Sequence, residues 1–197
     1  NEADVGLLTA SYGVSDEVTL TTFPLFGAIG APSLRGKVRL ARTPQLAWSL
    51  HTGFGLMFAQ RLRGSERSYL GLTVGSALSW LASPSMTWSL LTEWDFETNA
   101  DQEAIEWEIQ SLRIGSSLTW ALSDRYLVQL MAKGSRVLLA PSGTTGVDAI
   151  GWGGKAMLAR AWDVFRVGAG VFGDPKLDEN LDVGTTWVPW IDFWWRW

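Results

Sequence analysis

Side chains alternate between bulky apolar types and small or polar types along most of this chain. In LAWSLHTGFGLMF, residues 46–58, the even positions are mostly Leu, Trp and Phe, whereas the odd positions hold Ala, Ser, His, Gly and Met. The same period of two recurs in residues 68–80 and 111–120. This period is typical of a β-strand whose two faces meet different environments, and helical spacing fits none of these segments. The chain is therefore predicted to be all-β.

The small face of these strands indicates how the sheet is turned. In a soluble sandwich or barrel, large apolar side chains point inward and charged ones face water. Here the small face is rich in Gly and Ser, and charged residues make up only 18% of the chain, which is unlike a solvated exterior. The pattern favours the inverted arrangement, with bulky side chains toward lipid and small or charged groups toward an enclosed lumen. A soluble barrel is the alternative.

Tryptophan is unusually abundant, with 13 residues in a chain of 197. No apolar run is long enough for a transmembrane helix, so strands would have to cross the membrane. Trp and Phe concentrate near the ends of the expected strands, where the aromatic girdles of a membrane barrel lie. The positions concerned are Trp48, Trp80, Trp88, Trp94, Trp120, Trp152 and Trp162.

The amino-acid composition excludes several classes of protein. The net charge of −4 gives no basic footprint for nucleic acid. The absence of Cys excludes a disulfide framework and a cysteine-based zinc site. No shift in composition marks a second domain, so residues 1–197 are expected to form a single transmembrane β-barrel domain.

Turn signals divide the chain into hairpins of two kinds. Short turns rich in Ser, Asp and Pro are expected near 15–17, 42–45, 82–85, 122–125 and 161–164. Longer connections alternate with them, at 27–36, 60–67, 95–106, 140–151 and 172–186. Outer-membrane barrels have this asymmetry, with short periplasmic turns and long outer loops. The expected strands are 5–14, 17–26, 34–42, 46–58, 67–82, 85–95, 107–122, 125–138, 150–161, 164–172 and 187–197.

The segments GVSDEVTL, ALSDRYLV and the closing IDFWWRW resemble the Gram-negative outer-membrane β-barrel proteins. The resemblance implies a location in the bacterial outer membrane. It also implies that the last strand is the signal read by the barrel-assembly machinery. The residues that match this signal are Ile191, Phe193, Trp195 and Trp197. The usual last residue of the class is Phe, so Trp197 departs from the pattern.

The number of expected strands raises a question of closure. Eleven are visible, whereas bacterial single-chain barrels have an even number. We expect a transmembrane antiparallel up-and-down β-barrel of twelve strands, with one strand preceding Asn1. Ten strands, or a seam filled by another chain, are the alternatives. Something must close the seam, because an unpaired edge in lipid is costly.

Alternation also assigns side chains to the inner wall. The expected lumen-lining residues are Lys37, Arg39, His51, Glu93, Asp95, Arg113, Gln129, Lys133, Lys155, Arg166, Asp192 and Arg196. Their basic excess would favour anionic solutes through electrostatic focusing. Inward glycines, Gly75 among them, suggest open space, although the charged groups could instead pair across the lumen and fill it.

The sequence predicts a pore for passive diffusion of small hydrophilic, anionic solutes. One alternative is a structural barrel plugged by its own charged side chains that docks another envelope protein. A weaker alternative is a lipid-modifying enzyme that uses His51. Because this single His has no nucleophile elbow nearby, we expect no enzyme, no catalytic residue, no cofactor and no metal site. The expected partners are the lipid bilayer, the barrel-assembly machinery and another envelope protein, with no nucleic acid.

Two carboxylates conflict with the pattern. Glu106 and Glu108 share the parity of Leu112 and Ile114, which are expected to face lipid, and a charge at membrane depth is expensive there. We expect this part of the strand to project above the bilayer, or a bulge near Ser111 to change its face.

Overall fold

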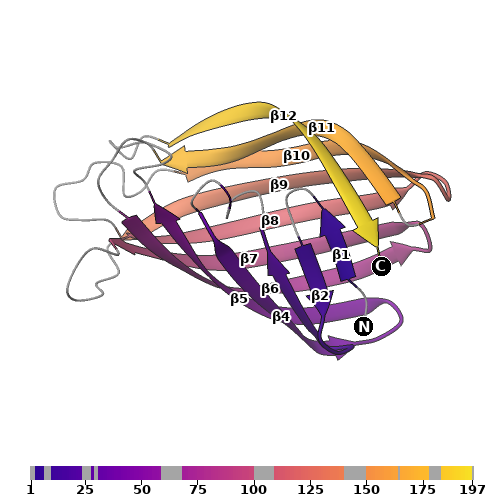
Figure 1. Ribbon diagram of the computed structural model, residues 1–197, viewed down its shortest axis with the longest axis horizontal. Helices are drawn as coiled ribbons and strands as arrows, with labels where there is room; N and C mark the ends of the chain where they lie inside the picture. The colour runs from indigo at the N-terminus through magenta and orange to yellow at the C-terminus, as the bar shows by residue number, and fades with distance from the viewer. Residues whose placement is uncertain are drawn as a thin grey trace.

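The computed structural model describes residues 3–6, 10–23, 28, 31–58, 68–99, 109–139, 150–163, 165–177 and 183–196. These residues form twelve strands in a closed antiparallel barrel, in which each strand pairs with its neighbours in sequence and β1 pairs with β12 (Figure 1). The strands are β1 (Ala3–Gly6), β2 (Ala10–Gly13), β3 (Val18–Thr22), β4 (Ser33–Arg42), β5 (Leu46–Phe58), β6 (Ser68–Ser83), β7 (Met86–Asn99), β8 (Ile109–Ala121), β9 (Tyr126–Leu139), β10 (Ile150–Ala161), β11 (Phe165–Leu177) and β12 (Val183–Arg196).

The count of twelve agrees with the sequence prediction, but the twelfth strand is not where it was expected. The segment predicted as one strand over 5–14 supplies two short strands, β1 and β2, which pair with each other. β1 also pairs with β12, with Val5 opposite Trp195. Folding back in this way gives both edges of β1 a hydrogen-bonding partner, which a lipid environment demands. The seam therefore closes without a strand before Asn1 or a second chain.

The barrel wall is uneven in height. β1 and β2 have four residues each and β3 has five, whereas β6 has 16. Figure 1 shows β1 and β2 as short arrows beside the two termini, in front of the long strands. The N- and C-terminal ends of the described chain lie at the end of the barrel that carries the short turns.

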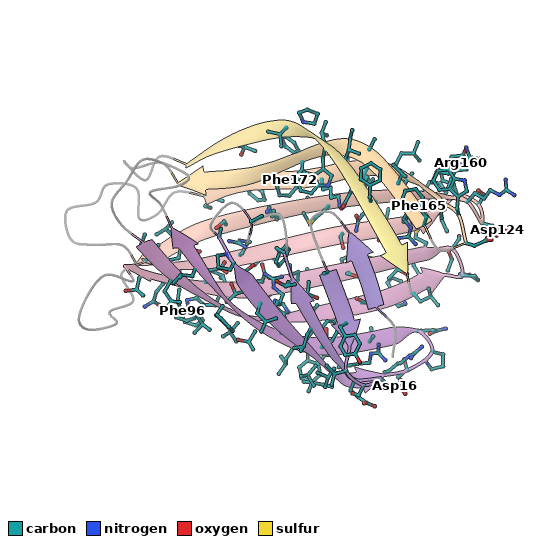
Figure 2. The ribbon with its side chains drawn as sticks, in the orientation of Figure 1. Asp16, Phe96, Asp124, Arg160, Phe165 and Phe172 are labelled. Atoms are coloured by element: carbon teal, nitrogen blue, oxygen red, sulfur yellow. The ribbon has the colours of Figure 1, made fainter. Side chains whose placement is uncertain are left out.

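The short turns are closed by serine side chains. In the turn between β2 and β3, the Ser15 hydroxyl oxygen accepts hydrogen bonds from the backbone N–H groups of Glu17 and Val18, both at 3.2 Å. Ser123 makes the same pair of contacts between β8 and β9. Figure 2 shows Asp16 and Asp124, which follow these serines, at the same end of the barrel. The turns are formed as the Ser-Asp pairs predict.

The bulky face of the sheet points outward, as predicted. Phe54 and Ile114 are 57% and 50% exposed on the outer surface, whereas His51, Glu93 and Asp95 are buried inside. A soluble barrel would have the opposite distribution. The tryptophans named in the sequence analysis are likewise exposed on the outside, namely Trp48, Trp80, Trp88, Trp94, Trp120, Trp152 and Trp162.

Two of these tryptophans have a specific partner for the ring N–H. The Nε1 of Trp48 donates to the Ser76 hydroxyl at 2.8 Å, and the Nε1 of Trp88 donates to the Ser116 hydroxyl at 2.7 Å. In each pair the serine is outward-facing on the next strand. The contacts satisfy a polar group at the membrane-facing surface.

The end of β11 and the start of β12 differ from the boundaries predicted from the sequence. The connection expected over 172–186 is largely strand, because β11 continues to Leu177 and β12 begins at Val183. Ladder pairing overrides the local turn signals here. Pro175, opposite Thr185 on β12, is tolerated because β11 pairs with β10 only as far as Gly173 among the described residues.

The register of β8 against β9 shifts between Gln110 and Ser111, where a bulge was expected. The extra residue is Leu138 in β9, so the bulge does not change the phase of β8 against β7. Glu106 and Glu108 lie outside the described residues. Among the described residues, no helix is long and apolar enough to span a membrane.

Candidate functional site

Strand register aligns charged side chains in one row across the inner wall. Lys37 on β4 lies opposite His51 on β5, and His51 lies opposite Gly75 on β6. Gly75 in turn lies opposite Glu93 on β7, and Glu93 lies opposite Arg113 on β8. Glu93 is near the middle of its 14-residue strand. The row therefore passes near the middle of β7.

Glu93 is the centre of an ion-pair network. Its Oε1 lies 3.1 Å from Arg35 Nη1 and 3.0 Å from His51 Nε2. Its Oε2 lies 3.3 Å from Arg113 Nη1. Both oxygens of this buried carboxylate thus have charged or hydrogen-bonding partners, which a charge in a low-dielectric position requires.

Asp95, two residues farther along the same face of β7, belongs to the same network. Its Oδ2 lies 3.1 Å from Arg113 Nη2, and its Oδ1 accepts a 2.7 Å hydrogen bond from the Thr73 hydroxyl. Arg113 bridges Glu93 and Asp95, since each of its two terminal nitrogens contacts one carboxylate. We call the six residues Arg35, His51, Thr73, Glu93, Asp95 and Arg113 the lumen cluster.

Gly75 makes the contact between His51 and Glu93 possible. These two residues lie on β5 and β7, with Gly75 between them on β6. A Cβ at residue 75 would overlap the His51 ring and the Thr92 carbonyl oxygen. The prediction that Gly75 indicates open lumen is therefore wrong, because the imidazole of His51 fills that space.

The lumen cluster presents its cations to the interior and hides its carboxylates. The Glu93 side chain is 4% exposed, whereas the Arg113 and Arg35 side chains are 29% and 36% exposed. The arginines, lying over the acids, form the accessible surface. A solute in the lumen meets guanidinium groups first.

A cavity of about 390 Å³ adjoins the lumen cluster. It reaches from β4, β7 and β8 to β9 and β11, and Phe23, which follows β3, also borders it. Its lining includes Phe23, Arg35, Leu91, Arg113, Lys133 and Phe172. Its wall is thus part cationic and part apolar.

The far side of this cavity is aromatic. Lys133 Nζ on β9 lies 5.1 Å from the centroid of the Phe172 ring on β11, within the range of a cation–π interaction. The Phe172 ring packs against Trp190 on β12, with 5.4 Å between centroids. Figure 2 shows Phe172 on β11, on the side of the barrel where β10 to β12 lie. We call Lys133, Phe172 and Trp190 the aromatic wall.

Asp192 on β12 is a third buried carboxylate, 4% exposed. Its Oδ1 accepts a hydrogen bond from the Phe193 backbone N–H at 3.0 Å. Lys155 on β10 is its cationic neighbour. This pair lies outside the lumen cluster.

The structure brings together only part of the set of lumen residues predicted from the sequence. His51, Glu93, Asp95 and Arg113 meet in the lumen cluster, and Lys133 borders the cavity. The others occupy inward positions of the register and are not members of the cluster, although Lys37 lies directly opposite His51; they are Lys37, Arg39, Gln129, Lys155, Arg166 and Asp192. Arg196 lies opposite Asp4 in the register between β12 and β1.

Sequence reasoning missed Arg35, Phe23 and Phe172. Arg35 could have been found, because it has the parity of Lys37 and Arg39 on the same strand. Phe172 could also have been found, because it ends the strand expected over 164–172 and has the inward parity of Arg166. Phe23 lies within the strand expected over 17–26, at the parity of Thr19 and Thr21, but in the structure it follows the end of β3.

Of the expected assembly signal, Ile191 and Phe193 are exposed on the outer face of β12. Trp195 lies opposite Val5 and Phe165 in the register, and Trp197 is outside the described residues. Within the described part of the chain, no group of three or more metal-binding side chains is placed to hold an ion.

No family model and no curated protein matches this chain. Several solved structures have a similar fold. OmpT of Vibrio cholerae is 13% identical, with a TM-score of 0.56 over 96% of this chain and 64% of that chain. A bacterial polysaccharide outer-membrane secretin is 12% identical, with a TM-score of 0.59 over 100% of this chain and 69% of that one. The NanC porin is 10% identical, with a TM-score of 0.56 over 99% and 97%.

The chain spans less than two thirds of the Vibrio cholerae OmpT chain. At these identities the likeness shows the fold alone. That fold, with the apolar outer surface described above, is the fold of a transmembrane β-barrel of the bacterial outer membrane.

Proposed function

We propose that this barrel is a pore for passive diffusion of small hydrophilic anions across the outer membrane. The observation that carries the proposal is the arrangement of the lumen cluster, in which Arg35 and Arg113 cover buried carboxylates and face a cavity. Cations in a confined space raise the local concentration of anions.

The balance of charge on the inward-facing side chains also supports a preference for anions. Among the described residues, cations outnumber carboxylates at inward positions of the register. The cations are Arg35, Lys37, Arg39, Arg113, Lys133, Lys155 and Arg166, and the carboxylates are Glu93, Asp95, Glu97 and Asp192.

The position of the ion pairs supports a pore over a plug. The partners of Glu93 and Asp95 come from β4, β5, β6 and β8, which are neighbours in the wall. Among the residues that the structure describes, these contacts run along one side of the barrel, from β4 to β8. A barrel of twelve strands is also wider than the eight-stranded barrels that side chains fill.

We assign His51 a structural role and propose no enzymatic activity. Its Nε2 contacts Glu93 Oε1, and its side chain is only 5% exposed. A general base needs a ring nitrogen within reach of a nucleophile or of water. In this arrangement the imidazole instead orients the carboxylate that holds the arginines.

Conductance in planar bilayers tests the proposal. The folded barrel is expected to give steady single-channel currents and, in a potassium chloride gradient, a reversal potential that indicates preference for chloride. Electrical silence of a correctly folded sample would overturn the pore and favour a plugged barrel that docks another envelope protein.

A matched pair of variants tests whether the preference for chloride comes from side chains in the lumen. Lys133→Gln removes a charge at the cavity, and Arg136→Gln removes a charge from the opposite, outer face of the same strand. One charge at about 8 Å in water changes local anion concentration roughly twofold, so Lys133→Gln is expected to weaken chloride preference. Arg136→Gln should leave it unchanged, and equal effects of the two variants would contradict the assignment.

The outer face of β12 supports a role in assembly. Ile191 and Phe193 project outward in alternation there, as the resemblance to outer-membrane barrels implies for a strand read by the barrel-assembly machinery. Replacing both with Ser is expected to lower the amount of barrel in the outer membrane. Trp187→Ser, an exposed position earlier in β12, is the control, and an equal loss in both variants would argue against a terminal signal.

A further inference from the structure

The cavity beside the lumen cluster has two chemically different sides. One side carries the partly exposed guanidinium groups of Arg35 and Arg113. Phe23, Leu91 and Phe172 supply apolar surface to the same cavity. A pore lined for water and simple ions alone has no need of two phenyl rings beside its arginines.

The two kinds of surface are close enough to meet one small molecule. Lys133 Nζ lies over the Phe172 ring at 5.1 Å, and both residues border the cavity together with Arg113. Packing against Trp190 holds the Phe172 ring in place. Cationic groups and an ordered aromatic surface therefore line one cavity.

The size of this space suits a small organic anion. Its volume of about 390 Å³ is in the range of small-molecule sites, which combine apolar walls with a few placed polar groups. An inorganic anion could use only the cations. An anion that carries a phenyl ring could also bury apolar surface, and burying about half of the ring gives roughly a tenfold gain in affinity.

We infer that this cavity is a binding site for small anions that carry an aromatic group. Arg35 and Arg113 hold the anionic group, while Phe23 and Phe172 contact the ring. The inference rests on the proposed pore and deepens it, because it names the class of solute for which the pore has an affinity.

Two sulfonates of equal charge test the inference. Benzenesulfonate and methanesulfonate stay ionised at all working pH values and differ in the apolar group. Added to a barrel that conducts chloride, benzenesulfonate is expected to block half of the current at roughly one tenth of the methanesulfonate concentration. Equal half-blocking concentrations would overturn the inference while leaving the pore intact.

Matched variants locate the site. Phe172→Ala is expected to remove most of the tenfold difference between the two sulfonates. Phe54→Ala, which removes a ring from the outer face of β5, should preserve it. Persistence of the difference in folded Phe172→Ala would also overturn the inference, and Phe23→Ala provides a second test on another part of the chain if Phe172→Ala does not fold.

Direct binding separates this inference from the proposed function. Calorimetry on the folded barrel in detergent is expected to show tighter binding of benzenesulfonate than of methanesulfonate, whether or not the barrel conducts. Electrical silence with selective binding would overturn the pore alone. Conductance without selective block or binding would overturn the aromatic-anion site alone.

Discussion

The two sides of the lumen carry their charges in different ways. On β4 to β8, Glu93 has three charged or ionisable partners within 3.3 Å, and Arg113 joins it to Asp95. On β9 to β12, Asp192 has Lys155 as its cationic neighbour, and Lys133 lies over the Phe172 ring. One side is a network centred on Glu93, whereas the other combines an ion pair with aromatic surface.

This difference teaches how the same barrel can be rigid and still accommodate a solute. Buried networks are strongly interdependent, because removing one member leaves the others desolvated and unpaired. The side with β4 to β8 therefore fixes the position of its arginines. The aromatic wall offers a surface that has no fixed hydrogen-bond geometry and can accept several partners.

The largest effect is expected from Glu93→Gln. This change removes the negative charge that Arg35, His51 and Arg113 share, so it should lower the free energy of unfolding by about 3 kcal/mol. Partial exposure of the two arginines keeps the loss at the lower end of the range for buried pairs. Urea unfolding in lipid vesicles, followed by tryptophan fluorescence, measures it.

Asp124→Asn, in the exposed turn between β8 and β9, is the control for Glu93→Gln. It should change the free energy of unfolding by less than about 0.5 kcal/mol. If the two variants were equally stable, the network on β4 to β8 would not be a source of rigidity.

A smaller loss is expected from Gly75→Ala. The added methyl group would overlap the His51 ring and the Thr92 carbonyl oxygen, which should cost about 2 kcal/mol as overpacking. Gly71→Ala is a close control on the same face of β6, because its Cβ would have no neighbour nearer than 3.9 Å. The same unfolding measurement compares the two, and similar losses would show that the effect comes from glycine itself rather than from the place of His51.

The smallest effect is expected from Asp192→Asn. The Asn side chain can still accept the hydrogen bond from the Phe193 backbone N–H, so the attraction to Lys155 is the main interaction lost. A decrease of about 1 kcal/mol in the free energy of unfolding is expected, well below that of Glu93→Gln. A loss as large as that of Glu93→Gln would mean that the two sides of the lumen are equally networked.

Much of the fold could be predicted from the sequence, because alternation with a period of two is a local property. The outward position of Phe54 and Ile114 and the inward position of Glu93 and Arg113 follow from parity along single strands. The serine-closed turns at Ser15 and Ser123 are local as well. Strand ends were less predictable, since pairing extended β11 and β12 through residues that favour turns.

The candidate site was predictable only in part. Parity named His51, Glu93, Asp95 and Arg113 as inward residues, but it gave no information about which of them touch. That depends on the register between strands, which brings Gly75 between His51 and Glu93. The sequence therefore suggested space at Gly75, where the structure places an imidazole ring.

The sequence by itself determined which face of each strand meets lipid and which meets the lumen, because successive side chains of a strand point to opposite sides of the sheet. Only the tertiary structure decided how the barrel closes, with β1 and β2 formed from one expected strand. It also decided that the Glu93 carboxylate lies beneath Arg35 and Arg113. Closure and ion pairing depend on distances between segments far apart in the chain, which a local pattern does not encode.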